Sequence, residues 1–270
     1  MNLTIVYMVA GLSSRFGGKI KSFTKVGPKG ETLIEYSVNQ AIKAGFNKII
    51  FVVGEHTEKP FKKKFGNNYK GIPVEYALQK YDKEKRDKPW GTCDAVCCTI
   101  ETIHEPFVVA TGDDLYSEKT FEDLVNHLKT SEDDATIGMD LIEMFPKNKR
   151  AVSRGLFKID NEDYVIDGEE STGISRENFK ERGFNEKTPV SMSIFGLHQN
   201  TLQLLNEKLK IFRKQNSEDR KVECFLNETL ISLIKENKIK MKLYPFSGKW
   251  LGITNPEDEI KVREELKKIN

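Results

Sequence analysis

A short loop near the start of the chain gathers glycine, serine and basic residues in the pattern of a phosphate site. It runs Ala10-Gly11-Leu12-Ser13-Ser14-Arg15 and continues, after two more glycines, to Lys21. Glycine lets backbone amides approach a ligand closely, consecutive N–H groups can hold phosphate oxygens, and Arg15 and Lys21 bring positive charge. The loop predicts a polyphosphate site, with an ordinary strand-to-helix connection as the plain alternative. Neither GxxxxGK[ST] nor GxGxxG is present, which disfavours P-loop kinases and dinucleotide enzymes.

The first half of the chain alternates strand-like and helix-like segments that would position this loop. Strands are expected at residues 3–9, 49–53, 74–78 and 107–110, and helices at 32–44, 92–103 and 118–129. The strand segments are continuous apolar runs, which is typical of strands buried on both faces of a parallel sheet. We therefore expect an α/β fold with a doubly wound, mostly parallel sheet, and ligands at the carboxyl ends of its strands, just after Val9, Leu78 and Ala110.

The second half shows a more mixed pattern. Strands are expected at residues 136–142, 156–159, 190–197 and 240–244, separated by polar loops, with helices at 201–213, 222–236 and from 256 onward. No internal repeat or extended linker is visible, which favours one domain over residues 1–270. Within it, residues 1–130 would form the nucleotide-binding half and residues 131–270 the half that binds the second substrate.

Composition limits the partners of the protein. With 43 Lys and Arg against 41 Asp and Glu, the formal charge is +2, so no global field would attract nucleic acid or an anionic membrane. No apolar run approaches the roughly 18 residues of a membrane span, and the N-terminus lacks the features of a signal peptide, so a cytoplasmic protein is expected. The four cysteines have no CxxC spacing and are expected to be reduced.

Several motifs together resemble the sugar-1-phosphate nucleotidyltransferase family. Gly11, Ser14, Arg15 and Lys21 match its glycine-rich signature, and residues 26–37 resemble the segment that leads into its first helix. Further similarities, which reach nearly the whole chain, are found in Gln79, in Pro89-Trp90-Gly91-Thr92, in Thr111-Gly112-Asp113-Asp114, in Val152-Ser153-Arg154-Gly155, in Val190-Ser191-Met192-Ser193 and in residues 250–258. The resemblance is to a bacterial-type branch that uses UTP or dTTP, and it implies a Rossmann-like, GT-A-like fold.

The resemblance also implies roles for individual residues. Arg15 and Lys21 would be catalytic, and Asp113 would bind Mg²⁺. The nucleotide would be bound by Ala10, Gly11, Ser13, Ser14, Gln79, Gly91 and Thr92, with Gln79 at the base edge. The sugar would be bound by Gly155, by Glu169 or Glu170, and by Ser191, although a solvated acidic loop explains the two glutamates equally well.

Two positions depart from the family pattern. Ser13 replaces a glycine, which is tolerated where no positive φ is needed. Gly252 follows Trp250-Leu251, where many relatives carry a second metal-binding aspartate. Asp114 and Asp258 are the alternatives for that ligand, or Mg²⁺ relies on phosphate oxygens and water.

The expected reaction joins a sugar 1-phosphate to the nucleoside monophosphate part of an NTP and releases pyrophosphate. The sugar phosphate is already ionised near neutral pH, since its second pKa is about 6, so cations rather than a protein base would promote the reaction. UTP is the favoured nucleotide, glucose 1-phosphate and N-acetylglucosamine 1-phosphate are both open, and relatives often form homo-oligomers. The competing interpretations are a non-catalytic nucleotide-sugar sensor and a GT-A glycosyltransferase.

Overall fold

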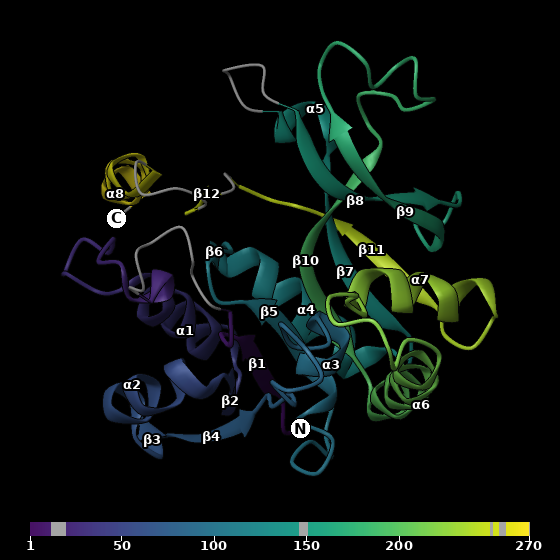
Figure 1. The fold of residues 1–270 in the computed structure, drawn as a ribbon. Coiled ribbons are helices and arrows are strands. Elements are labelled where there is room, and N and C mark those ends of the chain that lie inside the picture. The colour runs from purple at the N-terminus through teal and green to yellow at the C-terminus, as the bar shows by residue number, and fades with distance from the viewer. Residues whose placement is uncertain (12–19, 146–150, 249–250, 254–257, 270) are drawn as a thin grey trace.

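The strands pair into one large twisted sheet. The computed structural model of the chain describes residues 1–11, 20–145, 151–248, 251–253 and 258–269. Along the sheet, neighbouring strands follow the order β11 (Met241–Pro245), β7 (Asp134–Asp140), β10 (Pro189–Leu197), β5 (Phe107–Thr111), β1 (Thr4–Met8), β2 (Lys48–Val53), β4 (Ile72–Leu78) and β3 (Asn68–Tyr69) (Figure 1). The predicted fold class, a doubly wound and mostly parallel α/β sheet, is confirmed.

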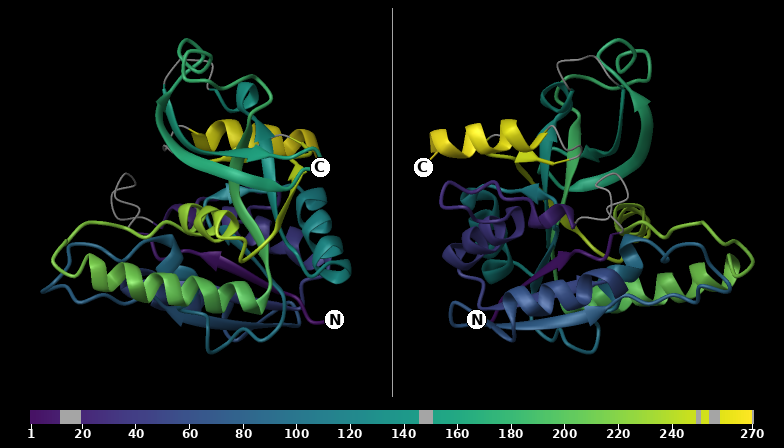
Figure 2. Two further views of the ribbon diagram at one scale, coloured as in Figure 1. Left: turned by 90° about the vertical axis from the view of Figure 1, so that its right-hand side faces the viewer. Right: turned by 60° about the vertical axis from the view of Figure 1, so that its left-hand side comes forward.

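The sheet joins the two halves of the chain. β5, β1, β2 and β4 are parallel neighbours, whereas β10 lies antiparallel to both β5 and β7. A long hairpin of β8 (Val152–Ile159) and β9 (Val165–Ile174) attaches to β10 and stands off from the main body in both views of Figure 2. A separate small ladder pairs β12 (Leu251–Gly252) with β6 (Asp114–Leu115).

Helices cover both faces of the sheet. Side chains of a strand alternate between faces, so Ile5 and Tyr7 of β1 enter one hydrophobic cluster while Val6 enters the other. The first face is covered by α1 (Leu33–Ala44), α2 (Glu55–Phe65) and α4 (Glu118–Thr130); the second is covered by α3 (Thr92–Cys97), α6 (Gln199–Gln215) and α7 (Leu226–Lys235). The remaining helical elements are η2 (Lys21–Phe23), α5 (Leu141–Met144) and α8 (Asp258–Ile269).

The helix that follows the phosphate loop has defined ends. At the start of α1, Thr32 and Glu35 form a capping box, in which Thr32 accepts from the Glu35 amide and Glu35 accepts from the Thr32 amide. At its end Gly45 takes φ +107°, a left-handed conformation that glycine adopts without a steric penalty. Among the helices of the described residues, none has both the length and the apolar character needed to cross a bilayer.

Several segments differ from the sequence-based expectation, among them α2, which is not among the expected helices, and the helix expected over 222–236, which begins at Leu226. The helix expected over 92–103 ends at Cys97, because turns with i to i+3 hydrogen bonds follow and the Thr99 hydroxyl bonds the Val96 carbonyl. The strand expected over 136–142 ends at Asp140, and Leu141–Met144 is helical. Glu169 and Glu170 lie in β9 rather than in a polar loop, since pairing with β8 satisfies their backbone groups while both side chains remain exposed.

Candidate functional site

Lys21 and Asp113 meet at the carboxyl ends of two neighbouring parallel strands. β1 and β5 are paired so that Met8 lies opposite Thr111, and the segments that leave both strands therefore emerge at the same edge. The Lys21 Nζ atom lies 2.6 Å from Asp113 Oδ2. The Lys21 side chain is 16% exposed and the Asp113 side chain 43% exposed, so the pair borders solvent from which an anionic ligand can enter.

Packing holds each partner of this pair. Lys21 begins the short helix η2, whose Phe23 ring packs against the Phe61 ring at a centroid distance of 4.7 Å. On the other side, the Gly112 amide donates to the Met8 carbonyl at 3.2 Å. A Cβ atom at Gly112 would lie 2.3 Å from a methyl group of Val9, so only glycine lets the chain turn here and place Asp113 beside Lys21.

Asp114 faces the interior instead. Its Oδ2 accepts a 2.9 Å hydrogen bond from the Thr111 hydroxyl, which also lies 2.9 Å from the Tyr116 hydroxyl. Burial, reinforced by the neighbouring charge of Asp113, raises the pKa of Asp114 to about 7. Asp113 is therefore the more accessible carboxylate of the two.

The residue that departs from the family pattern lies next to these carboxylates. Gly252 of β12 is paired with Asp114 of β6, and the Ile253 amide donates to the Asp113 carbonyl at 3.3 Å. The position where relatives carry a second aspartate is thus adjacent to Asp113, but here it has no side chain. Asp258 is the first residue of α8.

Gln79 lies at the carboxyl end of β4. Its backbone amide continues the ladder by donating to the Val53 carbonyl, and its side-chain Nε2 donates to the Gly91 carbonyl at 3.0 Å and to Asp94 Oδ2 at 2.7 Å. Gly91 has φ +99°, and a Cβ atom there would lie 2.6 Å from the Cys224 carbonyl. The Thr92 hydroxyl accepts a 2.9 Å bond from the Leu226 amide at the start of α7. Gln79, Gly91 and Thr92 therefore form one connected group.

On the β8–β9 hairpin, Gly155 lies opposite Glu170. A Cβ atom at Gly155 would come within 2.4 Å of Asn227 Nδ2 and 2.9 Å of Glu170 Oε1, and Asn227 Nδ2 donates to this oxygen at 2.9 Å. Burial raises the pKa of the Glu170 carboxyl. Glu169, the preceding residue of the strand, points to the opposite face, and both glutamates are exposed. The structure thus brings Glu170, not Glu169, next to Gly155.

Arg154, a cation without an expected role, is influenced by a carboxylate of the Asp113–Asp114 turn and by one of the Gly155–Glu170 pair. Burial lowers the pKa of Arg154, while the charges of Asp114 and Glu170 act on it in the opposite direction. Arg154 directly precedes Gly155 in β8 and donates to the Ser153 carbonyl at 2.9 Å. Its guanidinium thus lies in the electrostatic reach of both carboxylates.

Comparison with known proteins identifies the family. The family model described as nucleotidyl transferase matches residues 19–268. The chain belongs to this family. A search of curated proteins found no match to this nucleotidyltransferase.

Three solved structures share the fold of this nucleotidyltransferase at low sequence identity. A Bacillus anthracis protein assigned as a glucose-1-phosphate thymidylyltransferase, in complex with sucrose, has a TM-score of 0.73 at 14% identity, covering 99% of this chain and 96% of its own. A UDP-glucose pyrophosphorylase bound to UDP-glucose has a TM-score of 0.69 at 18% identity and covers 100% of both chains. The inositol-1-phosphate CTP transferase from T. maritima has a TM-score of 0.68 at 14% identity, covering 98% of this chain and 95% of its own.

Some predicted site residues of this nucleotidyltransferase lie within the described part of the chain, and others lie outside it. Ser13, Ser14 and Arg15 lie outside the described residues. Ala10 and Gly11 begin the loop, and the Gly11 carbonyl lies 3.0 Å from a ring nitrogen of His56. Ser191 is 7% exposed, and its hydroxyl accepts from the Ser193 amide at 3.2 Å, in an irregular part of β10.

Sequence reasoning missed Arg154, Asn227 and Asp94. Arg154 was inside a recognised motif, but the motif by itself does not show which carboxylates surround it. Asp94 is a stronger signal, since it is an acidic residue in the otherwise apolar run Thr92–Cys97 and a buried carboxylate requires partners. Its partners lie in other elements, so the sequence alone does not name them.

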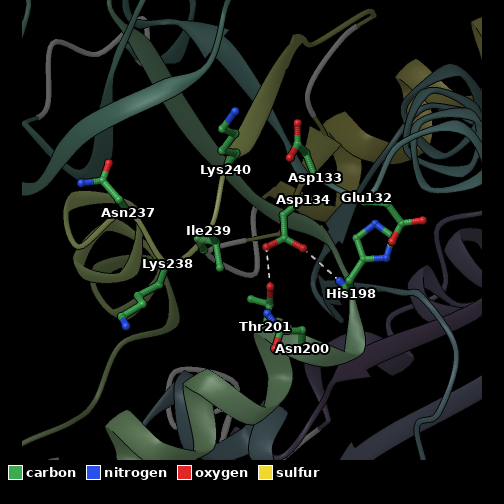
Figure 3. Close-up of a pocket in the computed structure, with 10 residues that line it drawn as sticks. All are labelled: Glu132, Asp133, Asp134, His198, Asn200, Thr201, Asn237, Lys238, Ile239 and Lys240. Carbon is green, nitrogen blue, oxygen red and sulfur yellow. Dashed lines mark hydrogen bonds between the residues drawn. The ribbon is translucent and has the colours of Figure 1, made fainter.

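Figure 3 shows the residues that line a cavity of about 300 Å³, which lies at the opposite end of the strands from Asp113. The antiparallel pairing of Leu197 with Phe107 places it beside the start of β5, whereas Asp113 follows its end. In the cavity wall Asp134 accepts from the His198 amide at 2.9 Å and from the Thr201 hydroxyl at 2.6 Å. These bonds satisfy the first turn of α6, so the visible role of Asp134 is to hold that helix.

Proposed function

We propose that this protein transfers a uridylyl group from UTP to a sugar 1-phosphate, giving a UDP-sugar and pyrophosphate. The observation that carries the proposal is the Lys21–Asp113 pair, with 2.6 Å between ammonium and carboxylate, at the carboxyl ends of β1 and β5. In a doubly wound sheet this edge is where ligands bind. A fixed cation and an accessible carboxylate are what a triphosphate and its divalent ion require there.

The reaction needs charge neutralisation more than acid–base catalysis. An oxygen of the sugar phosphate, already ionised, attacks the α-phosphorus; the new P–O bond forms as the bond to the β-phosphate oxygen breaks and pyrophosphate leaves. Lys21 would offset the charge that develops around the α-phosphate and the leaving group. Arg15, by resemblance to the family, would hold the β and γ phosphates with its planar guanidinium.

The residues present fit a Mg²⁺ ion that is bound partly by a protein carboxylate and partly by the substrate. Among the described residues, no group of three or more His, Cys, Asp or Glu side chains gathers to hold a metal. Asp113 is accessible, whereas Oδ2 of Asp114 already accepts from the Thr111 hydroxyl and Gly252 has no carboxylate to offer. Mg²⁺ commonly takes one or two carboxylates and completes its shell with phosphate oxygens and water, and it would supply positive charge along the triphosphate.

The sugar phosphate would bind on the β8–β9 side. Glu170 and Asn227 next to Gly155 can accept from and donate to sugar hydroxyls, and Ser191 lies on the neighbouring strand β10. Arg154, whose pKa is influenced by both Glu170 and Asp114, would supply a cation for the phosphate of the sugar. The same residues would serve glucose 1-phosphate and N-acetylglucosamine 1-phosphate, and both belong in the test. The names of the three related structures likewise include a glucose phosphate, a UDP-glucose and an inositol phosphate.

The test is a substrate panel with pyrophosphate as the readout. The full chain is incubated with Mg²⁺, each of UTP, dTTP, CTP, GTP and ATP, and glucose 1-phosphate or N-acetylglucosamine 1-phosphate. We expect pyrophosphate from UTP with one of the sugars, and its loss when EDTA is added. Binding of a UDP-sugar with no pyrophosphate from any pair would instead identify a non-catalytic sensor. Release of a nucleoside diphosphate from a UDP-sugar would identify a glycosyltransferase.

A further inference from the structure

A buried chain of hydrogen bonds ends on the side-chain amide of Gln79. Arg213 in α6 donates to Oδ1 of Asp94 in α3, and Asp94 Oδ2 accepts from Gln79 Nε2 at 2.7 Å. The second hydrogen of Nε2 points to the Gly91 carbonyl at 3.0 Å. Asp94 is 1% exposed and Gln79 is 8% exposed, so water does not compete for the two bonds that Gln79 donates, whereas the Arg213 side chain borders solvent. The chain is separate from the Lys21–Asp113 pair.

These contacts permit one orientation of the Gln79 amide. A glutamine side chain has two hydrogens on Nε2 and two lone pairs on Oε1. Both hydrogens are used by Gly91 and Asp94, which are acceptors. Turning the amide over would place Oε1 against those two acceptors, so the surroundings fix the position of nitrogen and oxygen. Gln79 therefore has only an acceptor, Oε1, left for a ligand.

The ion pair with Arg213 fixes Asp94 in turn. Each carboxylate oxygen has its own partner, since the guanidinium binds Oδ1 and Gln79 binds Oδ2. The Arg213 guanidinium carbon also lies 5.9 Å from the centre of the Trp90 ring, which is part of the same turn as Gly91. Without this cation, Asp94 would be a buried charge that lacks a counter-ion, a costly state that neighbouring groups would rearrange to relieve.

We propose that Arg213 and Asp94 are positioning residues that make Gln79 an obligate hydrogen-bond acceptor and thereby select the base of the nucleotide. The inference rests on the proposed function, in which Gln79 contacts the base. Uracil and thymine carry a ring N–H at the centre of their Watson–Crick edge, and guanine does as well. Cytosine and adenine carry a ring lone pair there, which would oppose Oε1. The arrangement accordingly favours UTP over CTP.

The decisive variant is Asp94→Asn. Arg213 has only donors, so it takes the Asn oxygen, and the new NH₂ group then faces Gln79. The Gln79 amide then keeps one of its two acceptors, the Gly91 carbonyl, and faces a donor in place of the other, so the orientation that presents Nε2 to the base becomes populated. We expect the ratio of kcat/KM for UTP to kcat/KM for CTP to fall on the order of tenfold or more. The reason is that UTP loses a matched hydrogen bond to the Gln79 amide, whereas CTP gains one. An unchanged ratio in a folded Asp94→Asn protein would overturn the proposal.

Asp134→Asn is the matched control, because it makes the same chemical change at a buried carboxylate at the opposite end of the strands. It should leave the ratio as in the wild type.

If Asp94→Asn does not fold, Arg213→Gln takes its place, since the Arg213 side chain is 42% exposed and its substitution is better tolerated. We expect a smaller fall, about threefold, for that variant. A wild-type ratio in folded Arg213→Gln would count against the proposal in the same way.

Calorimetric titration of UTP and CTP separates this inference from the proposed function. If the wild type releases no pyrophosphate with any pair, the proposed function fails, while the ratio of the two dissociation constants still tests the role of Asp94. A preference for UTP that Asp94→Asn reduces supports the positioning role. Wild-type binding of CTP as tight as that of UTP would reject it, whatever the activity.

Discussion

At the scale of single residues, the surroundings distinguish Asp113 from its neighbour Asp114. The two adjacent carboxyls at the end of β5 have different surroundings, since Asp113 faces Lys21 and solvent while Asp114 faces the Thr111 hydroxyl and the interior. Burial, together with the charge of Asp113, raises the pKa of Asp114 to about 7. Different surroundings thus allow one carboxylate to bind a cation and its neighbour to act as an internal hydrogen-bond partner.

We predict that Lys21→Ala lowers kcat about a hundredfold, since removal of one charge contact to a transition state costs on the order of 3 kcal/mol. Steady-state pyrophosphate release measures the effect. Lys43→Ala is the matched control, because Lys43 also pairs with a carboxylate, that of Glu118 at 3.6 Å, but is 64% exposed and lies in α1. Turnover of the Lys21 variant at the wild-type rate would remove Lys21 from the mechanism.

Asp134 gives a prediction about stability and pH. Burial raises the pKa of Asp134 to about 7, although its bonds with Thr201 and the His198 amide act in the other direction. In the unfolded chain an Asp titrates near 3.9, so the folded state binds the proton more tightly. The stabilisation is fully present below the unfolded pKa and is lost as the pH rises through about 7.

Asp134→Asn cannot ionise, so its free energy of unfolding should fall less than that of the wild type between pH 5 and pH 8. Urea unfolding of both proteins at the two pH values measures this difference. The comparison cancels the contribution of Asp114, which titrates in the same range and is present in both proteins. Parallel stability profiles for the two proteins would show that Asp134 does not titrate as inferred.

At the scale of elements, the sequence predicts local structure better than it predicts long-range contacts. Residues 80–88 show a run of mixed charges that is typical of a mobile flap or a solvated surface. In the structure Arg86 is 3% exposed, lies 3.4 Å from the centre of the Trp90 ring, and donates to the Asp219 carbonyl at 2.7 Å. Asp219 is 133 residues away along the chain, and no local pattern could have indicated it.

The same distinction explains which parts of the site could be predicted. The phosphate loop, Gln79 and Asp113 each follow a strand, and strand ends are visible in the sequence as the ends of apolar runs. The choice between Glu169 and Glu170 depends on the register of β9 against β8, and a one-residue shift in a strand exchanges the two faces. That register is set by packing on α7, where Asn227 and Ile231 lie close to Gly155 and Gly168.

The turn at Gly91 gives a prediction at this scale. Gly91→Ala should lower the free energy of unfolding by about 1–3 kcal/mol because its backbone conformation, φ +99° and ψ −168°, is essentially restricted to glycine, and further because the new Cβ atom would lie 2.6 Å from the Cys224 carbonyl. Gly71→Ala is the control, since Gly71 has φ +87° with no atom within 4 Å of a Cβ. Urea unfolding of both variants isolates the steric part, and equal losses would show that the turn can move away from Cys224. We also expect weaker UTP binding by the Gly91 variant alone, because Gln79 bonds to this turn.

At the scale of the whole molecule, both halves of the chain contribute to one sheet. Phe195, Gly196 and Leu197 of β10 pair with β5, so the strand that leads into Asp113 has a neighbour from each half. The hydrophobic cluster on the α3, α6 and α7 face likewise combines residues from before and after residue 130. Substrates bound to the first half and to the hairpin would therefore be held by a continuous framework, which suits a reaction that depends on alignment.

This architecture predicts that residues 1–130 do not fold alone. Removing residues 131–270 would leave the edge of β5 unpaired and expose Val6, Val109 and Phe107, all of which are fully buried in the whole chain. Unpaired strand edges and lost apolar burial both favour aggregation or unfolding. Thermal melting followed by circular dichroism should show a cooperative transition for the full chain and none for the fragment, and co-expression with residues 131–270 should restore it. A fragment that melts cooperatively by itself would mean that the nucleotide-binding half is an independent domain, and the β5–β10 pairing would then be a contact between domains rather than part of one folding unit.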